Sequence, residues 1–130
     1  MGQESGRILI VDDQPALLRM MSVYLTRLGY TVTMAATTEG ALAMVEADPQ
    51  GTDVAVLDAT MPGMSMEQLA LGILRANPKL RVLGASGYPV DMAAVEAAAP
   101  GRVAFLQKPF PPEMLAAAVR SLLGAQKEDI

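Results

Sequence analysis

The stretch that decides the fold is VAVLDATMPGM, Val54 to Met64, in which four apolar residues lead directly into the carboxylate of Asp58. A continuous apolar run of this length is typical of a strand that is covered on both faces, as in a parallel sheet. The following Met61-Pro62-Gly63 segment ends such a strand. A charge at the end of a core strand is costly unless the site uses it, so Asp58 is the first candidate functional residue.

Four further apolar runs resemble this one and predict a sheet of five strands. The five runs are Ile8–Val11, Val32–Ala35, Val54–Leu57, Val82–Ala85 and Val103–Leu106. A segment with helical spacing of apolar residues follows each run. The predicted helices run from Pro15 to an exit at Gly29, from Thr38 to Ala47, from Ser65 to a stop at Asn77-Pro78, from Val90 to Ala98, and from Pro112 to about Leu123. Five βα units predict an open, doubly wound parallel α/β sheet, and are too few for a closed eight-stranded barrel.

Length and composition limit the possible functions. The chain has 130 residues, 52% of them hydrophobic, which suits one domain with one packed core. The net charge is -4 without a basic patch, so we expect no nucleic-acid binding. The chain contains no Cys and no His, which excludes thiolate and imidazole chemistry from its own side chains. The apolar runs are too short for a signal peptide or a membrane span, so we expect a cytoplasmic protein.

The domain prediction follows from the same patterns. We expect a flexible N-terminal segment at residues 1–6, one domain at residues 7–124 and a short tail at residues 125–130. No linker or low-complexity run divides the central part.

Polar residues that carry chemistry follow four of the five predicted strands. In an open α/β sheet, ligands bind at the carboxyl ends of the strands. Three carboxylates that converge there would repel one another by about 3 kcal/mol per pair at about 5 Å, with an effective dielectric constant of about 20, so a cation is needed. Oxygen ligands select a hard ion such as Mg²⁺. The converging residues are Asp12 and Asp13 after the first strand, Asp58 after the third, Ser86 after the fourth and Lys108 after the fifth.

This constellation suits phosphoryl transfer. A carboxylate beside a bound cation can attack a phosphoryl group, and positioning with charge neutralisation supplies most of the catalysis. Asp58 is the candidate nucleophile, Lys108 would pair with phosphoryl oxygens, and Ser86 would bond one more.

Taken in order, the motifs resemble those of the receiver domain of two-component response regulators, over essentially the whole chain. Each motif alone is weak, but all of them lie in or after predicted strands in the family's order. The matching residues are Asp12-Asp13, Asp58 with Met61-Pro62, Ser86, the aromatic Phe105 three residues before the lysine, and Lys108-Pro109-Phe110, whose lysine–proline bond is usually cis in the family. The chain departs from the family at Ser65-Met66, where Asp-Gly or Gly is common, and at Phe105, where Tyr is more usual.

The resemblance implies a fold, a site and partners. The strand order would be the flavodoxin-like 2-1-3-4-5. Mg²⁺ or Mn²⁺ would be held directly by Asp13, Asp58 and the backbone carbonyl of Thr60, and by Asp12 through water. Asp58 would be the phosphoacceptor, with Ser86 and Phe105 forming a conformational switch.

The expected donor is a phosphohistidine on a sensor histidine kinase or a histidine phosphotransfer protein. An effector or a second copy of the chain could bind the face made by the fourth helix, fifth strand and fifth helix. The family members are signalling domains and not turnover enzymes, apart from metal-dependent self-phosphorylation and slow autodephosphorylation.

Other interpretations stay open on the sequence alone. The segment Ser86–Pro89 resembles receivers of hybrid sensor kinases that act as phosphate relays or sinks, and a pseudo-receiver would bind partners without phosphorylation. An aspartate-nucleophile phosphatase usually needs a second acid where this chain has Thr60. A flavodoxin-type flavin site would not carry two aspartates after the first strand. Asp12-Asp13 could simply cap the first helix, and Phe105 could be plain core.

Overall fold

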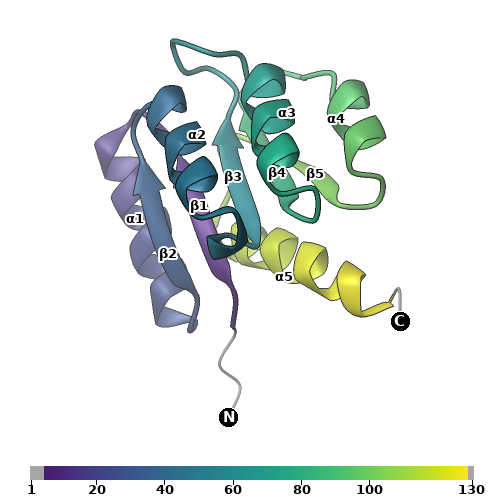
Figure 1. Ribbon diagram of the computed structural model, residues 1–130. Helices are drawn as coiled ribbons and strands as arrows, with labels where there is room; N and C mark the ends of the chain where they lie inside the picture. The colour runs from purple at the N-terminus through teal and green to yellow at the C-terminus, as the bar shows by residue number, and fades with distance from the viewer. Residues whose placement is uncertain (1–4, 129–130) are drawn as a thin grey trace.

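The computed structural model describes residues 5–128 as a single parallel sheet with helices on both faces (Figure 1). Every neighbouring pair of strands is parallel, and the order is β2-β1-β3-β4-β5, which confirms the predicted flavodoxin-like arrangement. The strands are β1 (Arg7–Val11), β2 (Thr31–Ala35), β3 (Val54–Asp58), β4 (Arg81–Ser86) and β5 (Val103–Gln107).

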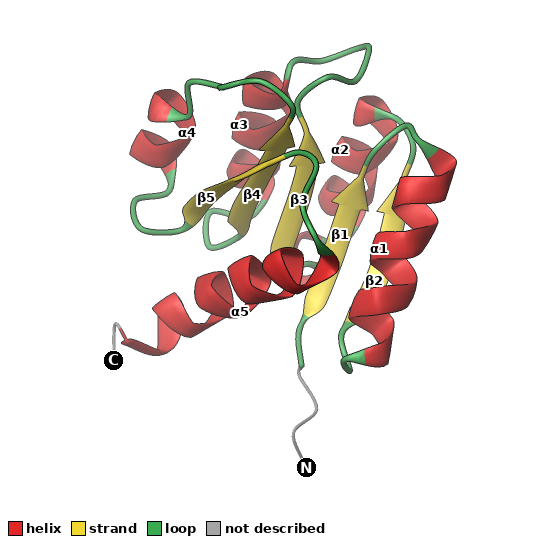
Figure 2. Cartoon of the chain, turned by 180° about the vertical axis from the view of Figure 1, so that it is seen from behind, coloured by secondary structure: helices red, strands yellow, loops and turns green. Residues whose placement is uncertain are grey.

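The helices form two layers. Helices α1 and α5 cover one face of the sheet, while α2, α3 and α4 cover the other (Figures 1 and 2). Within residues 5–128, no helix is long and apolar enough to cross a bilayer. The bounds are α1 (Pro15–Arg27), α2 (Thr38–Ala47), α3 (Met66–Ala76), α4 (Ala93–Ala98) and α5 (Pro112–Glu128), with a short 3₁₀ turn, η1 (Pro49–Gly51), that the apolar pattern did not predict.

Burial of both faces explains why the strands have continuous apolar sequences. Along β1, Ile8 and Ile10 pack into the layer shared with α1 and α5, whereas Leu9 and Val11 pack into the layer shared with α2 and α3. All four side chains are buried. Because successive side chains of a strand point to opposite faces, a strand between two helical layers needs apolar residues at every position.

Two helix ends differ from the sequence prediction. Helix α4 begins at Ala93, three residues after the predicted start at Val90. The side chain of Asp91 accepts a hydrogen bond from the Ala93 backbone N–H at 2.9 Å, and such a local turn competes with the helix. Helix α5 continues to Glu128, beyond the predicted end near Leu123 and into the predicted tail. The segment after Gly124 reads Ala-Gln-Lys-Glu, which are all good helix formers.

Parts of the two predicted terminal segments lie outside the described residues. These parts are residues 1–4 of the N-terminal segment and residues 129–130 of the tail. The carbonyl oxygen of Gly6 accepts a hydrogen bond from the Thr31 N–H at 2.9 Å, so Gly6 is already attached to the start of β2.

Candidate functional site

Three aspartates meet at the edge of the sheet where the strands end. Asp12 and Asp13 directly follow β1, and Asp58 is the last residue of the adjacent strand β3. One carboxylate oxygen from each lies within 4.8 Å of the other two. Asp12 and Asp58 are buried, with 1% and 5% exposure, whereas Asp13 is exposed. The acidic cluster, Asp12, Asp13 and Asp58, is therefore largely buried, with Asp13 exposed to solvent.

Lys108 supplies the cation of this site. It follows β5, and its Nζ lies 3.0 Å from Asp12 Oδ2 and 3.4 Å from Asp58 Oδ1. The bond from Lys108 to Pro109 is cis, as the family resemblance implied. Three carboxylates and one ammonium group leave a formal excess of two negative charges in the pocket.

Asp58 presents its two carboxylate oxygens differently. Both the backbone N–H and the hydroxyl of Thr60 donate to Oδ1, at 3.1 and 3.0 Å, and Lys108 approaches the same oxygen. Oδ2 has no hydrogen-bond partner among the described residues. The hydroxyl contact of Thr60 was not predicted from the sequence, which indicated a role for its backbone carbonyl and the lack of a second acid at this position. A hydroxyl two residues after a turn aspartate is the signal that could have indicated it.

Asp12 is not the cap of the first helix. The N-cap of α1 is Gln14, whose side chain makes no capping bond, and Asp12 Oδ1 accepts the Gln14 backbone N–H at 2.9 Å. The other oxygen of Asp12 pairs with Lys108. Asp12 thus fixes the turn that leads into α1 and also holds Lys108 in the pocket.

Ser86 and Phe105 lie on β4 and β5, the strands that follow the strand of Asp58 in the sheet. Ser86 ends β4, is buried, and lies one residue past Ala85, the register partner of Asp58. Its hydroxyl accepts the Tyr88 backbone N–H at 3.1 Å, and no hydrogen bond joins it to the acidic cluster among the described residues. Phe105 is half-buried on β5 opposite Gly84.

Backbone bonds fix the loops of the site to one another. The Ala59 N–H donates to the carbonyl of Ala85 at 2.9 Å, and the Lys108 N–H donates to the carbonyl of Ser86 at 2.8 Å. The segments after β3 and β5 are therefore both attached to the end of β4. A movement of Ser86 would therefore shift the segments after β3 and β5, which both contribute to the site.

The acidic cluster fits a small divalent cation. Mg²⁺ binds oxygen at about 2.0–2.1 Å, so two ligands on opposite sides of the ion lie about 4.2 Å apart. Carboxylate oxygens within 4.8 Å of one another need only a small closure, or a bridging water at one of them. The excess of two negative charges matches the charge of the ion.

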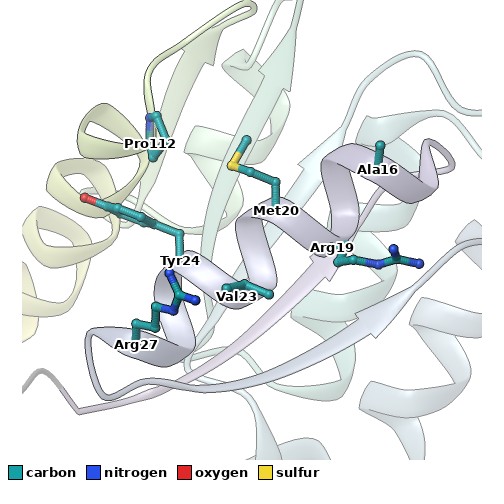
Figure 3. A pocket seen from close by; sticks show the side chains of 7 residues that line it. All are labelled: Ala16, Arg19, Met20, Val23, Tyr24, Arg27 and Pro112. Atoms are coloured by element: carbon teal, nitrogen blue, oxygen red, sulfur yellow. The ribbon is translucent and has the colours of Figure 1, made fainter.

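A groove runs along the outer side of α1, the helix that follows Asp12 and Asp13 (Figure 3). Helix α1 begins two residues after Asp13, and the groove reaches the first residue of α5, Pro112. Its volume is about 440 Å³. This surface was not predicted from the sequence, although Met20 and Val23 fall outside the buried stripe of α1 and are 37% and 43% exposed. The lining residues are Ala16, Arg19, Met20, Val23, Tyr24, Arg27 and Pro112.

Comparison with known proteins gives a consistent result. The family model described as "Response regulator receiver domain" matches residues 8–120. The sensor kinase CckA of Brucella abortus is 34% identical over 123 residues, which are 94% of this chain and 13% of that protein. The chemotaxis protein CheY of Thermotoga maritima is 28% identical over 116 residues, which are 89% of this chain and 96% of that protein.

The fold is matched as well. The crystal structure of a CheY-like receiver domain protein from Methanospirillum hungatei superposes with a TM-score of 0.81 and 29% identity, covering 96% of this chain and 99% of that one. The chain spans only a small part of the sensor kinase but nearly all of the chemotaxis protein, because the two relatives differ widely in length.

Proposed function

Because the chain belongs to the response regulator receiver domain family, we propose that Asp58 accepts a phosphoryl group from a phosphohistidine of a partner protein. The observation that carries this proposal is the position of Lys108, whose ammonium group lies within ion-pair distance of both Asp12 and Asp58 in a pocket with excess negative charge. A phosphoryl oxygen that enters the pocket would meet this ammonium group beside the attacking carboxylate.

The two oxygens of Asp58 would have separate roles. Oδ2, which has no hydrogen-bond partner among the described residues, forms the bond to phosphorus while the bond from phosphorus to the donor nitrogen breaks. Oδ1 stays held by Thr60 and Lys108. The leaving ring nitrogen takes up a proton from solvent, so the products are an acyl phosphate on Asp58 and a neutral histidine on the partner. The product's slow loss by hydrolysis, and not repeated turnover, would end the signal.

The acidic cluster would hold the metal ion. Asp13, Asp58 and the backbone carbonyl of Thr60 are the proposed direct ligands of Mg²⁺ or Mn²⁺, and Asp12 would act through a water molecule because its Oδ2 already pairs with Lys108. When bound, the ion would neutralise charge on the carboxylates and on the phosphoryl group.

The signal would leave the site through Ser86 and Phe105. The Ser86 hydroxyl accepts the Tyr88 N–H and keeps its own proton to donate. Because no hydrogen bond joins it to the acidic cluster among the described residues, reaching a new phosphoryl oxygen would move the end of β4. The half-buried ring of Phe105 lies on the neighbouring strand and could fill the space that opens. The face formed by α4, β5 and α5 would then change for an effector or a second copy of the chain.

The groove along α1 is the proposed docking surface for the phosphohistidine partner. Its lining starts at Ala16, three residues after the exposed Asp13, and combines the apolar side chains of Met20 and Val23 with the cations of Arg19 and Arg27 (Figure 3). A helix of a sensor kinase or phosphotransfer protein with an apolar stripe and flanking acidic residues suits this surface.

The metal requirement offers a test of the proposed function. The purified chain is incubated with acetyl phosphate, and the incorporated phosphoryl group is followed by intact mass with Mg²⁺ and with a chelator. We expect one phosphoryl group per chain, only with Mg²⁺. Asp13→Asn removes a proposed ligand at an exposed position and should reduce incorporation at least tenfold, whereas the exposed control Asp91→Asn should leave it unchanged. Incorporation that is independent of metal and of Asp13 would contradict the proposal.

A further inference from the structure

A cavity lined by polar residues lies at the opposite edge of the sheet, where β3 and β4 begin. Its volume is about 110 Å³, and its charged lining residues are Arg7, Asp53, Lys79 and Arg81. Asp53 and Asp58 are separated by the length of β3, which is roughly 16 Å at about 3.3 Å per residue. The cavity is therefore separate from the acidic cluster, and nothing in the proposed phosphoryl transfer uses it.

Arg81 is the unusual residue of this cavity. It is only 4% exposed, and its Nε has no hydrogen-bond partner among the described residues. Its Nη1 donates to the backbone carbonyl of Asp53 at 3.3 Å. Burial lowers the pKa of Arg81, the nearby charge of Asp53 opposes this change, and the neighbouring Arg102 adds to it. A buried cation is costly unless an anion compensates it. Because Nε is enclosed by protein, an anion in the cavity would face the other guanidinium nitrogens of Arg81.

Asp53 compensates this charge only in part. Its Oδ2 accepts the Arg7 backbone N–H at 2.8 Å and lies 3.4 Å from Arg7 Nε, so its carboxylate is occupied by Arg7. The guanidinium of Arg81 donates to the backbone carbonyl of Asp53, and no ion pair joins it to the Asp53 carboxylate among the described residues. Three cations against one carboxylate leave a formal excess of two positive charges around the cavity.

We propose that this cavity binds a small free oxyanion of the phosphate class, held by Arg81 and Lys79. The planar donors of a guanidinium group match the oxygens of such an anion. The size of the cavity limits the ligand to a small ion, because sites for drug-sized molecules are about 300–1,000 Å³ and this cavity has about 110 Å³. The anion lies at the starts of β3 and β4, where its negative charge offsets the excess positive charge around the cavity.

The test is a titration of the full ¹⁵N-labelled chain with inorganic phosphate, at constant ionic strength kept with sodium chloride and without divalent metal. Amide signals of Arg7, Asp53 and Arg81 are followed together with the Nε–H signal of Arg81. We expect a saturable shift at these positions, and about tenfold weaker binding in Lys79→Gln, because one charge-assisted contact is lost. Lys79 is exposed, so this variant should fold normally.

A matched control separates a specific site from a general charge effect. Arg120→Gln removes the same charge from an exposed position on α5, away from the cavity lining, and should leave phosphate affinity unchanged. Arg81→Gln, with its fold checked by its amide spectrum, should abolish the saturable shift. Shifts that are linear in phosphate, that chloride reproduces, or that survive in Lys79→Gln would overturn the proposal.

Discussion

At the scale of single residues, Lys108 supplies the positive charge that offsets the buried carboxylates of the acidic cluster. The buried carboxylates of Asp12 and Asp58 lie together with only this ammonium group for compensation among the described residues. Removing one partner of a buried ion pair leaves an uncompensated charge, which is more costly than the loss of a surface pair. The role of Lys108 in the unphosphorylated chain is thus to hold the site together.

The first prediction follows from this role. Lys108→Met should lower the free energy of unfolding by about 2 kcal/mol in metal-free buffer, a value discounted because the lysine side chain is 19% exposed. Mg²⁺ should recover most of the loss, because the ion would neutralise the same carboxylates. Urea unfolding in both buffers checks this. An equal loss with and without Mg²⁺ would show that the lysine stabilises the fold by packing alone.

At the scale of elements, the loop after β3 is attached to α2. The buried hydroxyl of Thr38 accepts the Met64 N–H at 3.1 Å. Gly63 has a φ of 96°, a backbone conformation that residues with a side chain rarely adopt. Ser65 then caps α3 with a complete capping box. The departure from the family's glycine at Ser65-Met66 is therefore accommodated by Gly63 and the Ser65 cap.

The second prediction tests this loop. A Cβ at Gly63 would lie 2.5 Å from Thr38 Oγ1, so Gly63→Ala should destabilise the chain by about 1–3 kcal/mol through strain and a lost contact. Gly87→Ala is the matched control, since its Cβ would meet no heavy atom within 4 Å and its φ is not positive. Comparable unfolding midpoints for the two variants would contradict the attachment of the loop.

The third prediction concerns β4, β5 and α4 as a switch. A beryllium fluoride mimic with Mg²⁺ should shift the amide signals of α4 and β5 and change the environment of the Phe105 ring. Phe lacks the hydroxyl that would keep a Tyr at the surface, so we expect its ring to be biased inward before phosphorylation. Ligands shift such an equilibrium only as far as they favour one state. A response confined to the loops around the acidic cluster would make the domain a phosphate relay or sink.

At the scale of the whole molecule, much of the architecture was predictable from periodicity. Continuous apolar runs such as Val54–Leu57 fixed the strands, because both faces of the sheet are buried. The convergence of Asp12, Asp58 and Lys108 followed from topology, since parallel strands present their carboxyl ends at one edge.

Other features were not predictable, for physical reasons. The start of α4 depends on a turn that the Asp91 side chain makes. The Ala-rich sequence that follows gives no sign of this turn. The buried state of Arg81 and the groove beside Met20 depend on which elements pack together, and charge or apolarity at single positions does not reveal this.

The fourth prediction addresses the groove. Val23→Asp should slow phosphoryl transfer from a phosphohistidine partner at least tenfold but leave incorporation from acetyl phosphate unchanged, because the small donor needs no docking surface. Met44→Asp is the control, with an apolar side chain of similar exposure, 39% against 43%, on α2 away from the groove lining. Equal slowing by both variants, or slowing with acetyl phosphate, would place docking elsewhere.

The most direct test of the central claim is the intact mass of the wild type and of Asp58→Asn after incubation with acetyl phosphate and Mg²⁺. The wild type should gain one phosphoryl group, and Asp58→Asn should gain none while keeping the amide spectrum of a folded chain. Incorporation by Asp58→Asn at the wild-type level would contradict the assignment of Asp58 as the phosphoacceptor.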